Sequence, residues 1–468
     1  MIRSWMRTLN RVLLRSKNEL EAYARANPKV CMIVWNTFET DARVTKEAVS
    51  LTKAGKAVTV IAVHAPGKTK RSESQHGFHV IRVDRTLRKR DSSAVQVTNR
   101  TTSHSDHHSS TKTINHVKQR PLMKKAVTFM IKYMKRLKNR LRNRLKKIPK
   151  LVLSKLRKRL PFLPKLIINI RFFTHAYRNK AGIYHSHDLN TLIPAYLVSR
   201  LRGTKLIYDA HEVSTDRAGW KNKKWWETIE RILIRKADQV ITTNQTRAEY
   251  FAKQYAISPP HIIRNVPPYQ ELKKTNRIRE VCQIDEEQPI ILYQGGIQRE
   301  RGIENMVKCI PLVRKGVFVF IGNGALKPDI INLVEDLGLQ SRACFIDAVP
   351  NEELLTYTAS ADIGLQLLQN TCFNHYSACS NKLHEYLMAG IPVIASDLPE
   401  MRKVVETTKT GLLVNPDEIE MVAQAINQLI EDKDLYHRLQ QNTRKAATMY
   451  KWENEEQKLL SIYGIKMA

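Results

Sequence analysis

Residues 380–397 combine the residue types and spacing of an anion site and a hydroxyl-binding site. Ser380 can begin a helix as its N-cap, and Gly390 can end it. The first backbone N–H groups of a helix have no partner within it, so they attract an anion, and Lys382 adds a full positive charge there. Glu385 follows on the same face and can accept two hydroxyl groups. The stretch predicts a diphosphate site beside a ribose site, and the alternative is a capped helix with a surface Lys–Glu pair.

Two glycine-rich turns are further candidates for phosphate binding. Gly295 and Gly296 follow the apolar run 290–293, and Gly322 follows a second apolar run. Glycine lets the backbone approach a phosphate closely, and Arg301 lies near enough to add charge. Such a turn is a weak signal by itself, and a solvated surface arginine is the alternative.

Polar residues also end two other apolar runs, at His187-Asp188 and at His211. Sites of open parallel sheets lie at the carboxyl ends of their strands, so these residues are expected at one sheet edge. A single histidine at a strand end is usually structural, but two such ends with an acid favour a functional edge. Arg43, behind the helix-capping Asp41, is either part of this edge or solvated.

Alternating strands and helices must position these groups. The apolar runs 29–35 and 58–63 flank an amphipathic stretch that ends at Gly55, which predicts a β-α-β unit and a parallel sheet. The chain has 468 residues, enough for two domains of ordinary size. Residues 225–237 predict a further helix with Trp225 facing inward.

Residues 380–397 resemble the donor-binding helix of family-4 (group 1) retaining glycosyltransferases of the GT-B fold. The similarity is closest to a subgroup with the motif S-x-N-K-L-x-E-Y-x-x-A-G-x-P-V-I, and residues 208–212 resemble its Y-D-x-H-E motif. The resemblance extends over about residues 28–85 and 181–465. It implies an α/β protein with two Rossmann-like domains facing a cleft. It also implies transfer of a sugar from a nucleotide-diphosphate sugar, with UDP-sugar favoured, to a hydroxyl acceptor, and no required cofactor or metal.

The resemblance assigns roles to residues of both expected domains. The catalytic residues would be His211, Arg301 and Lys382; donor binding would use Gly295, Gly296, Arg299, Gly322, Val349, Tyr376, Ser377, Ser380, Asn381 and Glu385; the acceptor side would hold Arg43, His187 and Asp188. Two positions depart from the family pattern: Gly296 stands at a usual arginine and Ser377 at a usual glutamate. The role of Arg299 therefore stays open, and Asn374, Tyr376 or Ser377 would contact the sugar.

The expected domain boundaries follow from the same pattern. They are a basic amphipathic helix at 1–27, an acceptor domain at 28–268 with a basic insertion at 86–180, a nucleotide-sugar domain at 269–448, and a helix at 449–468 that crosses back to the first domain. Within the insertion, residues 98–113 are polar without periodicity and are expected to be disordered. Their histidines are not expected to bind metal.

The basic charge is concentrated in one segment. The chain has a net charge of +34, and residues 85–180 hold 28 basic and two acidic residues. Within them, residues 121–160 repeat apolar residues every three or four positions, with lysine and arginine on the other faces. This pattern favours a helix lying on an anionic membrane surface. The alternatives are a helix packed on the protein's own core and, less favoured because no nucleic-acid motif is present, a nucleic-acid contact.

The location expected from these features is the inner face of the cytoplasmic membrane, with peripheral association. No apolar run is long enough to span a membrane, and residues 1–20 do not read as a secretory signal. The acceptor would be lipid-linked or polymeric, as in surface polysaccharide or glycolipid synthesis. Alternative functions are a GT-B epimerase or phosphorylase, or an inactive module that binds membrane or nucleic acid.

The six cysteines show no metal-binding or redox spacing. They are expected to be reduced thiols, as in cytosolic proteins.

Overall fold

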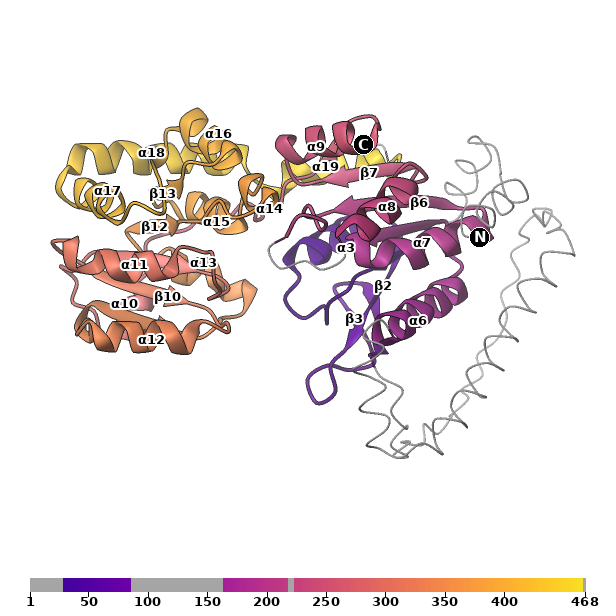
Figure 1. The fold of residues 1–468 in the computed structure, drawn as a ribbon, viewed down its shortest axis with the longest axis horizontal. Coiled ribbons are helices and arrows are strands. Elements are labelled where there is room, and N and C mark those ends of the chain that lie inside the picture. The colour runs from indigo at the N-terminus through magenta and orange to yellow at the C-terminus, as the bar shows by residue number, and fades with distance from the viewer. Residues whose placement is uncertain (1–27, 86–162, 218–222, 466–468) are drawn as a thin grey trace, which may run out of the picture. The chain divides into compact units, whose positions relative to one another are not determined.

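The computed structural model describes residues 28–85, 163–217 and 223–465 (Figure 1). The described residues up to 84 and from 169 onward belong to one compact unit, and residues 85–168 are assigned to a second. The expected helices at 1–27 and 121–160 and the expected disordered loop at 98–113 lie outside the described residues.

The first sheet has eight strands in the order β3-β4-β2-β1-β5-β6-β7-β8. All neighbours pair in parallel except β3 and β4. The strands are β1 (Lys29–Ile33), β2 (Ala57–His64), β3 (Ser72–Gln75), β4 (Phe78–Asp84), β5 (Ile183–His187), β6 (Lys205–Ala210), β7 (Gln239–Thr242) and β8 (His261–Ile262). The helices that accompany them are α3 (Ala42–Lys53), α6 (Leu163–Asn179), α7 (Leu189–Arg202), α8 (Lys223–Ile234) and α9 (Gln245–Tyr255). The buried apolar runs form the central strands because both faces of such a sheet are covered by helices.

The second sheet has six parallel strands in the order β11-β10-β9-β12-β13-β14. They are β9 (Ile290–Gln294), β10 (Val317–Ile321), β11 (Ala343–Ile346), β12 (Ile363–Gln366), β13 (Val393–Ser396) and β14 (Gly411–Val414). The helices are α10 (Arg277–Cys282), α11 (Ile303–Cys309), α12 (Lys327–Asp336), α13 (Asn351–Thr358), α14 (Phe373–Tyr376), α15 (Asn381–Ala389), α16 (Pro399–Thr408), α17 (Ile419–Glu431) and α18 (Lys433–Met449), with short 3-10 turns η1 (Ile310–Leu312) and η2 (Gln340–Arg342). The predicted pair of parallel α/β domains is confirmed.

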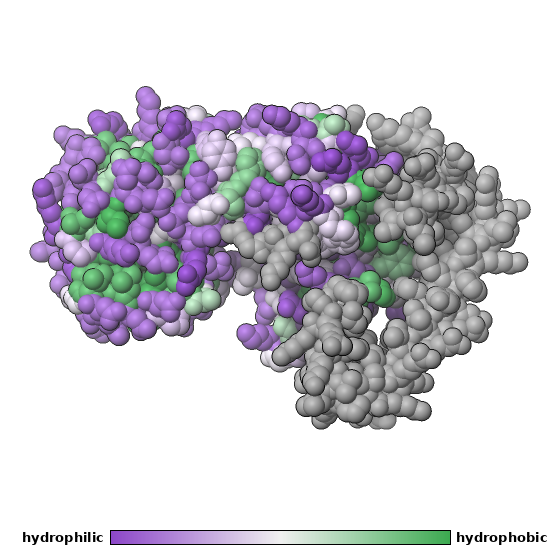
Figure 2. All heavy atoms as spheres, viewed as in Figure 1, coloured by the Kyte–Doolittle hydropathy of each residue, from purple (hydrophilic) through white to green (hydrophobic). Residues whose placement is uncertain are grey.

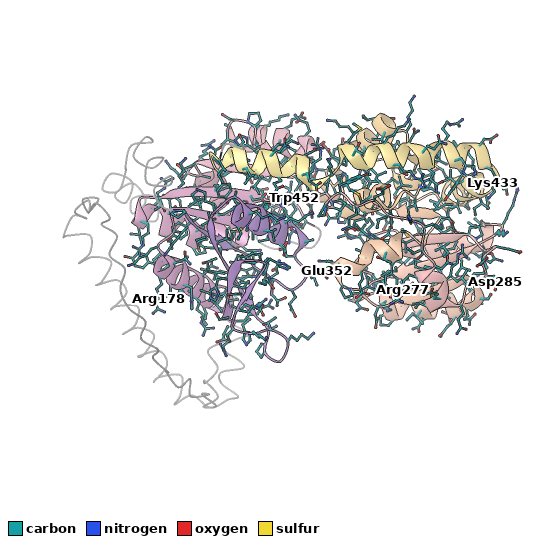
Figure 3. The ribbon with its side chains drawn as sticks, turned by 180° about the vertical axis from the view of Figure 1, so that it is seen from behind. Arg178, Arg277, Asp285, Glu352, Lys433 and Trp452 are labelled. Atoms are coloured by element: carbon teal, nitrogen blue, oxygen red, sulfur yellow. A yellow bond between two sulfur atoms is a disulfide. The ribbon has the colours of Figure 1, made fainter. Side chains whose placement is uncertain are left out.

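The last helix, α19 (Trp452–Ile462), packs into the core of the first sheet although it follows the second domain in sequence. Trp452, labelled in Figure 3, is 5% exposed, and its indole Nε1 donates to the Ser50 Oγ of α3 at 3.0 Å. The Trp452 backbone N–H also donates to the Pro267 carbonyl at 2.8 Å. The chain therefore crosses twice between the two domains.

Two features differ from the sequence expectations. Cys282 and Cys344 form a disulfide, with their Cα atoms 6.2 Å apart, so the expectation of six reduced thiols is wrong for this pair. The two residues are 62 positions apart in sequence, and only the fold brings the end of α10 beside β11. Trp225 is 56% exposed rather than inward, and its ring makes an edge contact with Trp226. On the face seen in Figure 2, hydrophilic residues predominate among the coloured atoms, with apolar residues between them.

Within the described residues, no helix is long and apolar enough to cross a membrane.

Candidate functional site

A cavity of about 530 Å³ lies where the carboxyl ends of both sheets contribute residues. The first domain lines it with the loop after β1 and with residues that follow β6, β7 and β8. The second domain lines it with Arg301, residues around α14, and the start of α15. Of the residues predicted from the sequence, the cavity wall contains Arg43, His211, Arg301, Asn374, Ser380, Asn381 and Glu385. Parallel α/β sheets commonly bind ligands at this edge.

At the start of α15, the backbone N–H groups of Asn381 and Lys382 have no hydrogen-bond partner among the described residues, as an anion site requires, whereas that of Leu383 donates to the Ser380 carbonyl. Ser380 occupies the N-cap position with extended backbone angles, but its side chain does not cap the helix. Its Oγ instead accepts a hydrogen bond from the Gln366 amide at 2.7 Å. Ser380 therefore occupies the predicted N-cap position, but its hydroxyl does not cap the helix as expected.

Lys382 and Arg301 bring two positive charges together with no acidic ion-pair partner among the described residues. The Lys382 side chain is 8% exposed, and its Nζ lies 3.7 Å from the centroid of the Tyr293 ring. Burial, followed by repulsion from Arg301, holds the pKa of Lys382 well below its usual value, although Glu385 opposes the shift. Arg301 lines the cavity and makes no hydrogen bond or ion pair within the described part of the chain. A dianionic ligand would relieve the repulsion between these cations.

Glycine is required at Gly322 by a close backbone contact and favoured at Gly295 by its positive φ, behind Lys382. A Cβ on Gly295, whose φ is +123°, would lie 3.3 Å from the Lys382 Nζ. A Cβ on Gly322 would lie 2.0 Å from the Gly295 carbonyl oxygen, which no side chain tolerates. The Gly296 carbonyl accepts a hydrogen bond from the Tyr293 hydroxyl at 2.8 Å. The turns therefore pack against the lysine and leave it room.

Glu385 lies on the wall beside Asn381. Its Oε2 accepts a hydrogen bond from the Gln294 amide at 2.5 Å, and Gln294 in turn accepts one from the Thr358 hydroxyl at 2.8 Å. Burial raises the pKa of Glu385. The carboxylate is held in one orientation and keeps capacity to accept a ligand hydroxyl.

On the first-domain wall, a buried ion pair joins Arg43 and Asp209. The Arg43 guanidinium donates to both Asp209 carboxylate oxygens, at 2.9 and 3.0 Å, and to the Ile263 carbonyl at 2.7 Å. Burial alone would raise the pKa of Asp209, but Arg43 and His211 hold it well below its usual value. Arg43 also lies 3.1 Å from Glu47. Its donors are therefore directed at the protein, so Arg43 positions Asp209.

His211 is held between two carboxylates. Its Nε2 lies 3.2 Å from Asp209, and its Nδ1 lies 3.6 Å from Asp188. Burial lowers the pKa of His211, but Asp188 and Asp209 together raise it to about 9. The imidazole is therefore protonated at neutral pH, and 19% of its side chain is exposed at the cavity.

Asp188 has a strained backbone that serves this arrangement. Its φ of +62° is uncommon for a residue other than glycine, and its Oδ1 accepts the backbone N–H of His211 at 3.1 Å. His187 is fully buried, with its Nδ1 3.1 Å from the His211 Nε2. Both residues support His211 from behind the wall.

Arg247 was missed by the sequence analysis. It is 6% exposed, its Nε donates to the Ser377 Oγ at 3.2 Å, and its Nη2 donates to the Asn374 Oδ1 at 3.1 Å. It also donates to the His211 carbonyl. Arg247 thus links the His211 strand end to α14 of the second domain. Nothing in its local sequence marks it, whereas Asp209 lies within the Y-D-x-H-E motif and could have been singled out.

Several predicted residues do not reach the cavity wall. They are Gly295, Gly296, Gly322 and Lys382, which lie at or against the turns, together with Arg299, Val349, Tyr376, Ser377, His187 and Asp188. Ser377 is fully buried and bonded to Arg247, and Tyr376 is 39% exposed and packs against Phe373. Of the three candidates for sugar contact, only Asn374 lines the cavity.

One buried group has the residue types of a metal site. Ligand atoms of Glu47, His185, His187 and Asp209 lie within 4.8 Å of one another. Arg43, however, contacts both carboxylates and already supplies positive charge to them. The donor set therefore fits an internal ion-pair network better than a cation.

Comparisons with protein families match two models. Residues 274–446 match the model described as "Glycosyl transferases group 1", and residues 132–266 match "Glycosyltransferase Family 4". The chain is 24% identical to alpha-D-kanosaminyltransferase of Streptomyces kanamyceticus, over 63% of this chain and 77% of the relative. It is 22% identical to D-inositol 3-phosphate glycosyltransferase of Corynebacterium urealyticum, over 62% of this chain and 73% of the relative.

Solved structures resemble the fold over most of the chain. Sucrose-phosphate synthase from Thermosynechococcus elongatus superimposes with a TM-score of 0.68 at 16% identity, covering 93% of this chain and 98% of that one. Anabaena HepE in complex with UDP-glucose superimposes with a TM-score of 0.65 at 12% identity, covering 93% of this chain and 99% of that one.

Proposed function

The chain belongs to the group 1 and family 4 glycosyltransferases with the GT-B fold, and from this premise we propose that it moves a sugar from UDP-sugar to a hydroxyl acceptor. Family membership makes it a transferase enzyme. The nucleotide, the stereochemistry and the acceptor belong to the proposal.

The observation that carries the proposal is the unpaired charge of Arg301 and Lys382 beside the start of α15. Negative charge grows on the diphosphate as the sugar leaves it, and fixed donors aimed at that charge lower the barrier. A cation pair without a protein counterion is already oriented for this task. The solved structure of HepE, a complex with UDP-glucose, supports UDP as the carrier.

We assign the ribose hydroxyls to Glu385, because its carboxylate is oriented by Gln294 on the cavity wall. We assign the transferred sugar to the space beside His211 and Asn374, which line the same cavity from the two domains. Transfer proceeds with retention of the anomeric configuration. The leaving phosphate accepts the proton of the incoming hydroxyl.

The charge pairing on the first-domain wall argues against a covalent sugar–enzyme intermediate at Asp188 or Asp209. Asp209 is fully buried and bonded to Arg43, and Asp188 is turned toward His211. Neither carboxylate is placed as a free nucleophile, which a double displacement would need. No metal or other cofactor is required in this scheme.

The test is a panel of nucleotide sugars scored for release of the nucleoside diphosphate, with and without a membrane lipid extract. We expect UDP release from one UDP-sugar, with product of retained configuration by NMR. Lys308, an exposed lysine on α11, provides the control for a Lys382 variant, because Lys308→Ala removes a lysine charge that is neither on the cavity wall nor against Tyr293. Donor consumed without any acceptor would indicate an epimerase, and dependence on inorganic phosphate would indicate a phosphorylase; either result would contradict the proposal.

We further propose that residues 121–160 bind the anionic inner face of the cytoplasmic membrane and bring the enzyme to a lipid-linked or polymeric acceptor of surface polysaccharide or glycolipid synthesis. Their basic amphipathic pattern supports this. The full chain should float with vesicles that contain anionic lipid, and a variant without residues 121–160 should not. Equal flotation of the two proteins would rule out this segment as the anchor.

A further inference from the structure

The loop of residues 36–41, after β1, has a backbone that the protein holds in one conformation at the cavity. Phe38 has a φ of +55°, although it is not a glycine. The Arg82 guanidinium donates to the carbonyls of Thr37 at 2.7 Å and Phe38 at 3.1 Å. The Phe38 ring is 3% exposed and meets Phe78 edge-on, with ring centroids 6.0 Å apart. The backbone of the loop is therefore held by the buried Arg82 and by the contact between Phe38 and Phe78.

The polar side chains at the two ends of this loop are used within it. Asn36 accepts the Phe38 backbone N–H at 2.8 Å and donates to the Asp41 Oδ2 at 2.7 Å. The Asp41 Oδ1 accepts the Val44 backbone N–H at 3.0 Å and caps α3. The charge of Asp41 is thus partly offset by the positive end of that helix.

Glu39 differs from its neighbours. Its side chain is exposed, it lines the cavity, and it makes no hydrogen bond or ion pair with the described residues. The nearby cations are engaged elsewhere, since Arg43 binds Asp209 and Arg82 binds Glu73. Glu212, another acid of this wall, pairs with Arg217. Arg247, also on this wall, has no acidic partner among the described residues, but its guanidinium donates to Ser377, Asn374 and the His211 carbonyl. Glu39 is therefore the exposed charge of the 36–41 loop that no described residue pairs, whereas Arg301 and Lys382 are the unpaired charges beside the start of α15.

We propose that Glu39 selects the charge class of the acceptor: the acceptor carries no anionic group beside its reacting hydroxyl, and an amine there strengthens binding. This inference rests on the proposed function, because it takes the first-domain wall as the acceptor side. A fixed backbone places the carboxylate at the cavity, so a phosphate or carboxylate on the acceptor would meet an uncompensated negative charge. An ammonium group would meet its counterion, and the benefit would fall as salt screens it.

The experiment uses three probes that differ at one position: methyl α-glucoside, its 6-amino-6-deoxy form and its 6-phosphate. Binding of each to the full chain saturated with UDP is measured by saturation-transfer NMR at low and at high salt. We expect the ammonium form to bind about fivefold tighter than the neutral form at low salt, the size of one exposed charge contact, and the phosphate form to bind most weakly. Glu39→Gln should remove this order, and Glu39→Lys should reverse it.

Glu286→Gln is the matched control, because Glu286 is an exposed glutamate that does not line the cavity. This control should keep the wild-type order. Tighter binding of the phosphate form, equal binding of the three probes, no binding of any probe, or an order that survives Glu39→Gln would each overturn the inference. Failure of UDP itself to bind would contradict the proposed function instead, so the two failures are distinguishable.

Discussion

The two walls of the cavity treat their charged residues in opposite ways. On the second-domain wall, Arg301 makes no ion pair within the described residues. Lys382, behind that wall, lies against Tyr293 with its pKa pushed down by burial and by Arg301. On the first-domain wall, Arg43 and His211 share the carboxylate of Asp209, at 2.9 and 3.2 Å. The second-domain side keeps positive charge without a counterion, whereas the first-domain wall pairs the buried charges of Arg43, His211 and Asp209 with one another and leaves the exposed Glu39 free.

This difference separates two uses of charge. A buried pair that is already satisfied fixes geometry, and removing one partner leaves the other charged and unpaired, which costs stability. A buried cation without a counterion in the protein lowers the free energy of unfolding. Binding of an anionic ligand restores that loss. We therefore expect substitutions on the first-domain wall to act on stability, and substitutions on the second-domain wall to act on turnover.

The largest effect is expected from Asp209→Asn. The change leaves the buried Arg43 without its carboxylate and removes one of the two acids at His211, so the free energy of unfolding should fall by about 3–5 kcal/mol. Urea denaturation measures it. Glu431→Gln, which breaks an exposed pair with Arg314, should cost less than about 1 kcal/mol and serves as the control. An equally small loss for Asp209→Asn would mean that the first-domain wall is not held by its ion pairs.

Lys382→Met should act on turnover instead. The substitution keeps an apolar stem against Tyr293 and removes the charge, so UDP-sugar turnover should fall by about 10²–10³-fold, or about 2.7–4 kcal/mol. The free energy of unfolding should stay the same or rise, because the folded state no longer buries a cation with a lowered pKa. Steady-state kinetics and urea denaturation on the same preparation test both halves. A loss of stability in Lys382→Met without loss of turnover would mean that Lys382 has a structural role, as we expect for the first-domain wall, and not a catalytic one.

The pH dependence of stability should report on His211. Its folded pKa of about 9 lies above the ordinary value of 6.5, so its contribution is present in full below pH 6.5 and is lost as the pH rises through 9. The contribution amounts to about 2–3 kcal/mol, from 1.36 kcal/mol per pH unit with an allowance for partial exposure. The difference in unfolding free energy between the wild type and His211→Gln should shrink between pH 6.5 and pH 9. A constant difference across that window would show that His211 is not held as a cation.

The smallest effect is expected where the walls meet. The Glu400 carboxylate of α16 accepts the backbone N–H and the hydroxyl of Thr246, both at 2.7 Å. Glu400→Gln keeps an oxygen acceptor but removes the charge, so the unfolding free energy should drop by about 1 kcal/mol. Turnover at saturating donor should be nearly unchanged. A large loss of turnover would place Glu400 in direct contact with substrate.

The fold could be predicted because its signals are local. Apolar runs predicted β1, β2, β5, β6, β9 and β10, and residues 380–397 predicted α15 and β13 within a few residues; β3, β4, β8 and β14 were not predicted. Lys382 and Arg301 could be named because helix starts and glycine-rich turns are visible in sequence.

The first-domain wall depends on contacts between distant residues. Arg43 and Asp209 are 166 positions apart, and Arg247 and Ser377 are 130 apart, so no local pattern links either pair. The sequence predicted that Arg43 lies at the sheet edge. It could not show that the Arg43 guanidinium donates its hydrogen bonds to Asp209. It could not show that Ser377 would be buried under Arg247, nor that Cys282 would meet Cys344. Trp225 was placed inward by helical periodicity, yet α8 leaves it exposed.

The most direct test of the account is calorimetry of UDP binding to the wild type and to Lys382→Met. A diphosphate seated against Arg301 and Lys382 loses one of its two cations in this variant. The account predicts UDP binding by the wild type and at least about tenfold weaker binding by Lys382→Met. Unchanged affinity for UDP in Lys382→Met would contradict it.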